Sequence, residues 1–251
     1  MLRAQVLQCA FAIFLLNLSI SGRSLADEKA EAILDRAIKA HGGAKELDKT
    51  KVGVVKYKTI VARPASDLEF VVEETFRLPG LYKRTVHATF EGKLRPVLSF
   101  ALKDGKGWIR REEGKAEPFT SKTEYTLEGS WQGIFVLLPQ MREKDYELTV
   151  GEKKKIRGKE VSGVVAVKGD MGVILYFDPE SGLLSKTEKT VTLKGKQVLA
   201  EVFYEDYKKV QGINYSTKIT VLTDGTKFLE IAQIEVKFLD KIDDREFKKP
   251  E

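Results

Sequence analysis

Two carboxylates stand two residues apart in the stretch YFDPESGLLSK, residues 176–186, and acids at such a spacing can bind a metal ion or perform acid–base chemistry. Pro179 favours an extended conformation for Asp178 and presets a turn, and Gly182 can adopt the positive φ angle that a corner needs. Runs typical of strands flank the stretch on both sides. The sequence therefore predicts a hairpin corner, with Asp178 and Glu180 at a wet tip and away from any cavity.

Other residues that could perform catalysis are few. The chain has 2 histidines. His41 stands beside a Gly-Gly helix stop, where a cation interacts favourably with the helix C-terminus, so it is predicted to be a structural cap rather than a base. His87 stands alone in a strand. Glu73 and Glu74 are neighbours on a strand and must point to opposite faces, so they cannot act together on one substrate atom.

No nucleophile elbow, Walker loop, dinucleotide-binding glycine pattern or zinc-protease motif occurs in the sequence. We therefore predict no enzyme, no catalytic residue and no cofactor. An active site built from carboxylates that the fold brings together stays open as an alternative. Asp240, Asp243 and Asp244 are predicted to form a solvated turn rather than a calcium site, so no metal is expected.

The charge of the chain is mildly basic, with a formal net charge of +6, and it is spread over the whole length. Such a charge favours solubility and gives no indication of nucleic-acid binding. The densest basic run, residues 152–159, could meet anionic head groups. We interpret it instead as an exposed hairpin tip or sheet edge, where lysines prevent edge-to-edge pairing.

The first residues have the pattern of a secretory signal peptide. Arg3 precedes the short apolar run AFAIFLLNL, and small residues follow at Ser24 and Ala26. We predict that residues 1–26 are the signal and that residues 27–251 form one domain; a retained membrane anchor is the alternative. The single cysteine, Cys9, lies within the predicted signal, so the exported chain must be stabilised by its core without a disulfide.

One amphipathic helix is predicted directly after the signal, because Ala30, Ile33, Leu34, Ala37 and Ile38 recur at helical spacing. A Gly-Gly pair at residues 42–43 ends it, and a second short helix is predicted at residues 44–47. A helix with one apolar face must pack against something else.

The remainder of the chain is mostly strand-like, with Gly-containing turns at even intervals. This pattern predicts a long antiparallel meander that is wet on one face and dry on the other. In the run 68–76, the alternating residues Leu68, Phe70, Val72 and Phe76 form an apolar face that only Glu74 interrupts. The predicted strands span residues 52–61, 68–76, 82–90, 97–102, 108–111, 146–150, 161–168, 172–177, 184–193, 198–207, 213–222 and 228–238.

A third predicted helix interrupts the meander in LEGSWQGIFVLLPQM, residues 127–141. Trp131, Ile134, Phe135 and Leu138 fall at i, i+3, i+4 and i+7, and Pro139 is predicted to end the helix. Because apolar residues continue around the other side, the helix should be buried on more than one side. It could plug the end of a barrel, or it could serve as a lid or lining for an apolar ligand.

Several motifs in this order resemble the LolA-like outer-membrane lipoprotein-sorting proteins. They are the helix ending in His-Gly-Gly at residues 41–43, FRLPGLYK at 76–83, KDGKGW at 103–108, YFDPESGLL at 176–184 and YEDY at 204–207. The resemblance implies an α+β, mainly antiparallel β fold. In it, an incomplete, curved β-barrel carries an N-terminal helix and an apolar mid-chain helix over its mouth, with a cavity for acyl chains between them.

The resulting hypothesis is a non-enzymatic carrier that is exported to the periplasm of a bacterial envelope and binds lipid or lipoprotein acyl chains. We expect Trp131, Ile134, Phe135 and Leu138 to line or gate the cavity. Trp108 and Phe76 are expected on the concave face of the sheet. The carrier is predicted to be a monomer with envelope membrane proteins as further partners and no nucleic acid. The alternative is an envelope sensor or protein-interaction domain without lipid cargo.

Overall fold

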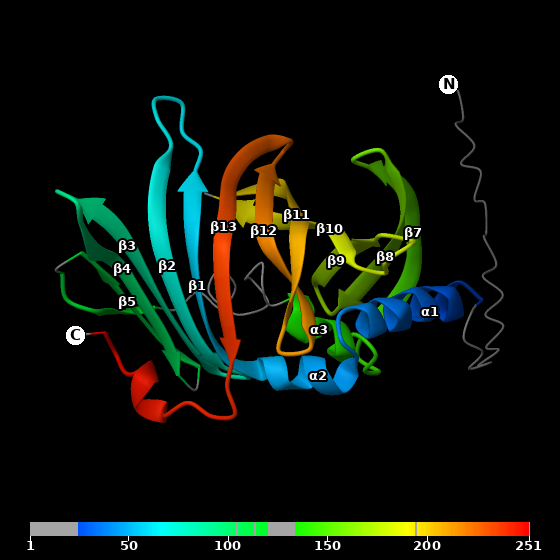
Figure 1. The fold of residues 1–251 in the computed structure, drawn as a ribbon, viewed down its shortest axis with the longest axis horizontal. Coiled ribbons are helices and arrows are strands. Elements are labelled where there is room, and N and C mark those ends of the chain that lie inside the picture. Colours follow the sequence, from blue (N-terminus) through cyan, green and yellow to red (C-terminus); the bar gives the residue numbers. More distant parts are fainter. Residues whose placement is uncertain (1–24, 104, 113, 120–133, 194, 251) are drawn as a thin grey trace, which may run out of the picture.

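The computed structural model describes residues 25–103, 105–112, 114–119, 134–193 and 195–250. In these residues a single 13-stranded sheet dominates, with the strand order β6-β5-β4-β3-β2-β1-β13-β12-β11-β10-β9-β8-β7. The sheet curves strongly, and helices α1 and α2 run along one of its ends (Figure 1). The order leaves β6 and β7 as free edges, so the predicted fold class, an incomplete antiparallel barrel with helices, is confirmed.

The strands follow the alternation in the sequence closely, and two of them, β1 and β10, have the predicted bounds. They are β1 Val52–Val61, β2 Leu68–Arg77, β3 Leu81–Phe90, β4 Lys93–Lys103, β5 Lys106–Arg111, β6 Glu117–Phe119, β7 Glu147–Ile156, β8 Lys159–Lys168, β9 Met171–Phe177, β10 Leu184–Leu193, β11 Lys196–Val210, β12 Ile213–Thr223 and β13 Thr226–Phe238. Strand β6 was not predicted, because three residues that include a proline carry no alternating pattern.

Helix α1, Leu25–Ala40, buries its predicted apolar face, with Ala30, Leu34 and Ala37 fully inaccessible, and it packs against β7 and β8. Helices α2, Ala44–Asp48, and α3, Ile134–Gln140, contact each other. Short 3-10 helices lie at Lys49–Lys51 (η1) and Asp244–Phe247 (η3). Within the described ranges, no helix has the length and apolar character needed to cross a membrane.

The His-Gly-Gly turn connects the end of α1 with the turn between β11 and β12 and with the start of β12. Gly42 has a φ angle of 123°, and a Cβ atom on it would lie 2.8 Å from the backbone oxygen of Gly212 in the turn between β11 and β12. Asn214 of β12 donates a side-chain hydrogen bond of 2.7 Å to the oxygen of Ala40. Only glycine therefore fits at position 42, because the turn and the hairpin are in backbone contact.

His41 has the predicted structural role at the end of α1, but it is buried and neutral rather than the expected cation. Its Nδ1 lies 2.8 Å from the oxygen of Ala37, and the backbone N–H of Leu184 in β10 donates to its Nε2 at 3.4 Å. These partners require a proton on Nδ1 and a lone pair on Nε2. Burial lowers the pKa of His41 from 6.5 to about 4, against the smaller opposing effect of the bond to Ala37.

The stretch at residues 176–186 is a hairpin corner, as predicted. One carboxylate oxygen of Asp178 accepts hydrogen bonds from the backbone N–H groups of Glu180 at 3.0 Å and Ser181 at 2.8 Å, and Gly182 has a φ angle of 74°. Glu180 lies at a wet tip as predicted, with a side chain that is 82% exposed, whereas the side chain of Asp178 is only 13% exposed. Arg36 of α1 donates a hydrogen bond to the backbone oxygen of Glu180. The corner therefore helps to hold α1 on the sheet.

The basic run at residues 152–159 forms the hairpin between β7 and β8, in agreement with the prediction. Four of its five cations pair with acids on β8, β10 and β11 and in the β9–β10 corner: Lys153 with Glu160, Lys154 with Glu188, Arg157 with Glu205, and Lys159 with Asp178. Near the C-terminus, Asp243 binds Arg245 and Asp244 binds Arg77, which fits the predicted solvated turn.

We expect Gly42→Ala to lower the free energy of unfolding by about 2 kcal/mol or more, because the new methyl group meets backbone atoms that cannot rotate away. Gly43→Ala is the matched control. Gly43 also has a positive φ angle, 90°, but a Cβ atom there has no neighbour within 4 Å. It should cost only backbone strain, about 1–3 kcal/mol, because its φ of 90° and ψ of 157° suit glycine, and Gly42→Ala should cost more than Gly43→Ala. Urea unfolding of both variants measures the difference, and equal losses would contradict the proposed close contact.

His41 should make the protein lose stability in mild acid. Its folded-state pKa lies below the ordinary value of 6.5, so its contribution is complete above pH 6.5 and is lost as the pH falls toward 4. The loss should reach about 3 kcal/mol, and it should be missing from the pH profile of His41→Asn. The histidine ¹⁵N shifts of the unaltered protein give a second measurement. A His41 that titrates near pH 6.5 would disprove this assignment.

Candidate ligand-binding face

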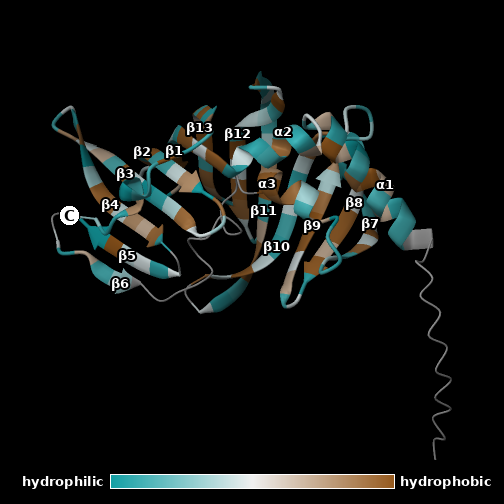
Figure 2. Ribbon diagram, turned by 90° about the horizontal axis from the view of Figure 1, so that it is seen from below, coloured by the Kyte–Doolittle hydropathy of each residue, from teal (hydrophilic) through white to brown (hydrophobic). Residues whose placement is uncertain are grey.

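The strand register defines two faces of the sheet. We call inner face the side that carries the core residues Val55, Val72, Phe76, Tyr82 and Phe100, and outer face the opposite side. Hydrophobic and hydrophilic residues alternate along the strands in Figure 2, as expected for a sheet with one dry face. Glu73 and Glu74 point to opposite faces, as predicted: Glu73 is exposed and pairs with Lys56, whereas Glu74 is buried.

The inner face is closed at one end and more open at the other. Near the helices, Phe76, Tyr82 and Phe100 are 5%, 2% and 1% exposed. Toward the hairpins at the opposite end, apolar side chains on β2, β3 and β4 are only partly buried. We call these side chains the apolar patch; they are Phe70, Val86 and Leu98.

A buried polar cluster lies between the closed end and the apolar patch. Glu74 on β2 pairs with Arg84, directly opposite it on β3, and its Oε1 accepts hydrogen bonds from Arg84 Nε at 2.8 Å and Tyr57 Oη at 2.8 Å. The guanidinium group lies 5.6 Å from the ring centre of Tyr82. Burial raises the pKa values of Tyr57 and Tyr82 well above the ordinary value, so both hydroxyls keep their protons at neutral pH.

One signal for this cluster is present in the sequence, since Glu74 interrupts an otherwise apolar face. The partners have no such signal, because Arg84 and Tyr57 come from other strands and meet Glu74 only through the strand register.

Three of the predicted lining residues lie on helix α3, where they are part of the packed core. Ile134, Phe135 and Leu138 are 8%, 1% and 0% exposed. The ring of Phe135 contacts aromatic rings from the His-Gly-Gly turn, β11 and β12, namely His41, Tyr204, Tyr207 and Tyr215. Trp131 lies outside the described residues. The prediction that α3 is buried on several sides is thus confirmed, whereas its role toward a ligand stays a prediction.

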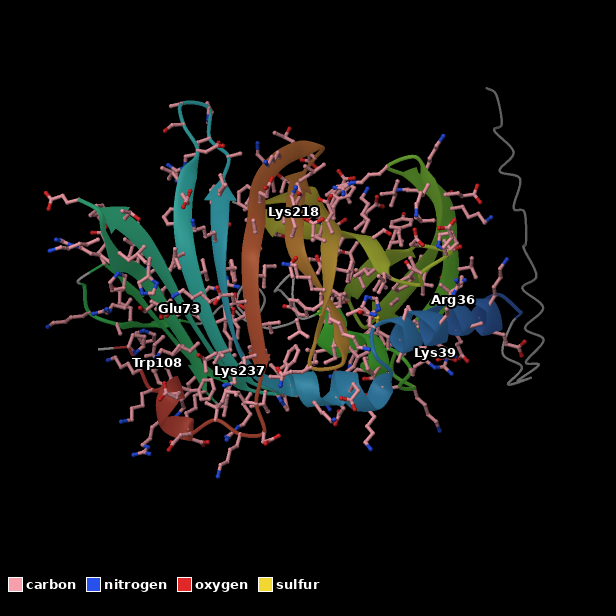
Figure 3. All side chains as sticks on the ribbon, in the orientation of Figure 1. Arg36, Lys39, Glu73, Trp108, Lys218 and Lys237 are labelled. Atoms are coloured by element: carbon pink, nitrogen blue, oxygen red, sulfur yellow. The ribbon has the colours of Figure 1, made fainter. Side chains whose placement is uncertain are left out.

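Phe76 and Trp108, the two sheet residues that were expected on the concave face, point to opposite faces. Phe76 lies on the inner face, next to Tyr82 on β3. Trp108 lies opposite Ala101 on β4, and Ala101 lies opposite Lys83 on β3. Paired residues share a face, and Lys83 lies on the outer face. The expectation that Trp108 lies on the concave face is therefore wrong (Figure 3). A strand of six residues shows too little alternation to fix its register from the sequence.

The outer face carries a shallow groove of about 460 Å³ over β1, β2 and β13. Charged side chains, among them Lys56, Glu73 and Lys237, line it together with Val54 and Thr75. Glu73 and Lys237 are labelled in Figure 3. It lies on the opposite side of the sheet from the predicted lining residues. Its charges and its position make it unlike a pocket for an acyl chain.

The described part of the chain shows no cluster of three or more His, Cys, Asp or Glu side chains that could hold a metal ion. His87 lies on the outer face of β3, and its Nδ1 makes no hydrogen bond there.

Comparison with known proteins gives matches by structure. No family model and no curated protein matches the sequence. A DUF1329 family protein from Desulfovibrio piger superimposes with a TM-score of 0.60 at 10% identity, over 87% of this chain and 97% of its own. A LolA superfamily protein from Nitrosomonas europaea gives 0.59 at 15% identity, over 88% and 97%.

An outer membrane lipoprotein-sorting protein domain from Vibrio parahaemolyticus gives a TM-score of 0.57 at 13% identity, over 87% of this chain and 97% of its own. At such low identity the likeness concerns the fold and does not extend to a ligand. The three matches nevertheless span nearly their full lengths and agree with the motifs in the sequence. The chain therefore has the LolA-like fold.

Proposed function

We propose that this protein is an exported, non-enzymatic carrier that holds the acyl chain of a lipid or lipoprotein against the inner face of β2, β3 and β4. The observation that supports it best is the apolar patch of Phe70, Val86 and Leu98, which is only partly buried on a face that is otherwise dry. Each methylene that moves from water onto such a surface contributes about 0.8 kcal/mol, so one long chain can supply most of a micromolar affinity.

The proposal assigns roles to the predicted lining residues. Phe76 forms the closed end of the binding face, and α3 with Ile134, Phe135 and Leu138 forms a wall beside it. Trp131 precedes α3 in the sequence and is proposed to contact the same ligand. Residues 27–251 act as one domain after removal of the signal peptide, in the periplasm of a bacterial envelope, where sorting of outer-membrane lipoproteins is one fitting task. The LolA-like fold of the neighbouring structures supports this assignment.

A second candidate, an envelope interaction domain without lipid cargo, is favoured by a separate observation. The exposed large apolar side chains of the described residues lie at or beside three hairpins, β3–β4, β8–β9 and β10–β11; they are Phe90, Leu94, Met171, Leu193 and Leu199. Phe90 and Leu94 belong to the same hairpin, and exposed apolar side chains that lie together are typical of contact surfaces. The double variant Phe90→Ser, Leu94→Ser should abolish partner capture if this candidate is correct, and should leave acyl binding intact if the carrier is correct.

We expect Val86→Glu to weaken acyl-chain binding about tenfold or more, because it buries a charge on the inner face where the chain would lie. The control is Val71→Glu. Val71 is also a partly buried valine, on the neighbouring strand β2, but it points to the outer face. It should leave binding unchanged. Displacement of a fluorescent fatty acid measures the affinity, and native mass spectrometry of the gently purified protein detects retained lipid.

The carrier proposal fails if the purified protein shows only its apo mass and takes up no fluorescent fatty acid. Equal losses of binding in Val86→Glu and Val71→Glu would also contradict it, since the effect would then not depend on the inner face.

A further inference from the structure

The polar cluster at Glu74 stands at the place where an acyl chain on the apolar patch would end. On β2, the inner face passes from the partly buried Phe70 through Val72 to Glu74, and on β3 it passes from Val86 to Arg84. The side chain of Glu74 is 2% exposed and that of Arg84 is 19% exposed. Arg84 is thus the more accessible partner of the ion pair.

The cluster contains a hydrogen-bond donor that has no partner among the described residues. Arg84 directs Nε and Nη2 at the same oxygen, Oε1 of Glu74, at 2.8 and 2.7 Å. Tyr82 is buried beside the guanidinium group, and its hydroxyl has no hydrogen-bond partner in the described ranges. Buried polar groups are nearly always paired, so an unpaired hydroxyl next to an arginine indicates a missing acceptor.

The charges of the cluster restrict that acceptor to an uncharged group. The carboxylate of Glu74 already balances the guanidinium of Arg84, and the remaining groups that face them, Tyr57 from β1 and Tyr82 from β3, are neutral. A fatty-acid carboxylate would bring a second negative charge next to Glu74 in a poorly solvated place, where like charges repel strongly. The carbonyl oxygen of an ester or amide accepts the same hydrogen bonds without this repulsion.

We propose that Arg84 and Tyr82 bind the carbonyl oxygen of an electroneutral acyl ester or amide, and that Glu74 selects against free fatty acids. The inference rests on the proposed carrier function and makes it more specific, because it names the chemical class of the bound lipid. Glu74 acts through charge and by positioning Arg84, whereas Arg84 and Tyr82 touch the ligand.

The test compares three probes of equal chain length, methyl laurate, lauramide and laurate, by displacement of a fluorescent alkyl probe from the full chain at neutral pH. The ester and the amide should bind about tenfold or more tighter than the acid. Glu74→Gln removes the balancing charge but keeps the shape, so it should strengthen laurate binding about tenfold and reduce or abolish the preference for the ester and the amide. The matched control is Glu73→Gln on the outer face, which should leave all three affinities unchanged.

A second measurement does not depend on the stability of the Glu74 variant. The carbonyl band of bound ¹³C-labelled methyl laurate should lie at lower frequency than in hydrocarbon, and Tyr82→Phe should shift it back toward the hydrocarbon value. Binding of all three probes with equal affinity, or a carbonyl band at the hydrocarbon frequency, would overturn the inference while the carrier function stands. If the fluorescent alkyl probe itself does not bind, both proposals fall together.

Discussion

The two edges of the described sheet are the constraint on which the rest of the structure depends. A closed barrel satisfies its own edges and encloses its interior, but here the order of the described strands ends at β6 and β7, and none of these strands closes the curved inner face. Something other than strand pairing must cover the dry side. At one end this is done by α1, α2 and α3, and the burial of Phe135 among aromatic rings shows how completely that part is filled.

The cover is held by a few polar and steric contacts around the end of α1. His41 links the helix end to β10 through its two ring nitrogens, and Gly42 brings the chain into backbone contact with the β11–β12 turn. Because these contacts fix the helices at one end only, the inner face keeps a gradient from closed to partly open. The apolar patch and the Glu74 cluster are consequences of that gradient, since they lie where the helical cover gives way.

Much of this arrangement was readable from the sequence because it depends on local patterns. The alternation in Val52–Val61 and the Gly-containing turns determine strands and hairpins within a few residues, and the His-Gly-Gly motif marks the helix end. The failures concern register and environment. The face of Trp108 depends on pairing with Ala101, and the neutral state of His41 depends on burial by residues far away in the sequence. Neither property is contained in a local pattern.

Glu74 is informative because stability alone does not explain it. A buried ion pair recovers little more than the cost of removing both charges from water, and apolar residues of similar size would often serve the fold equally well. Its neighbours on the same face, Val72 and Phe76, show that the sheet accommodates apolar side chains at these positions. A charge pair with a further unpaired hydroxyl in such a place is costly for a scaffold but useful for a site, because a ligand's carbonyl can satisfy groups that the fold leaves unsatisfied.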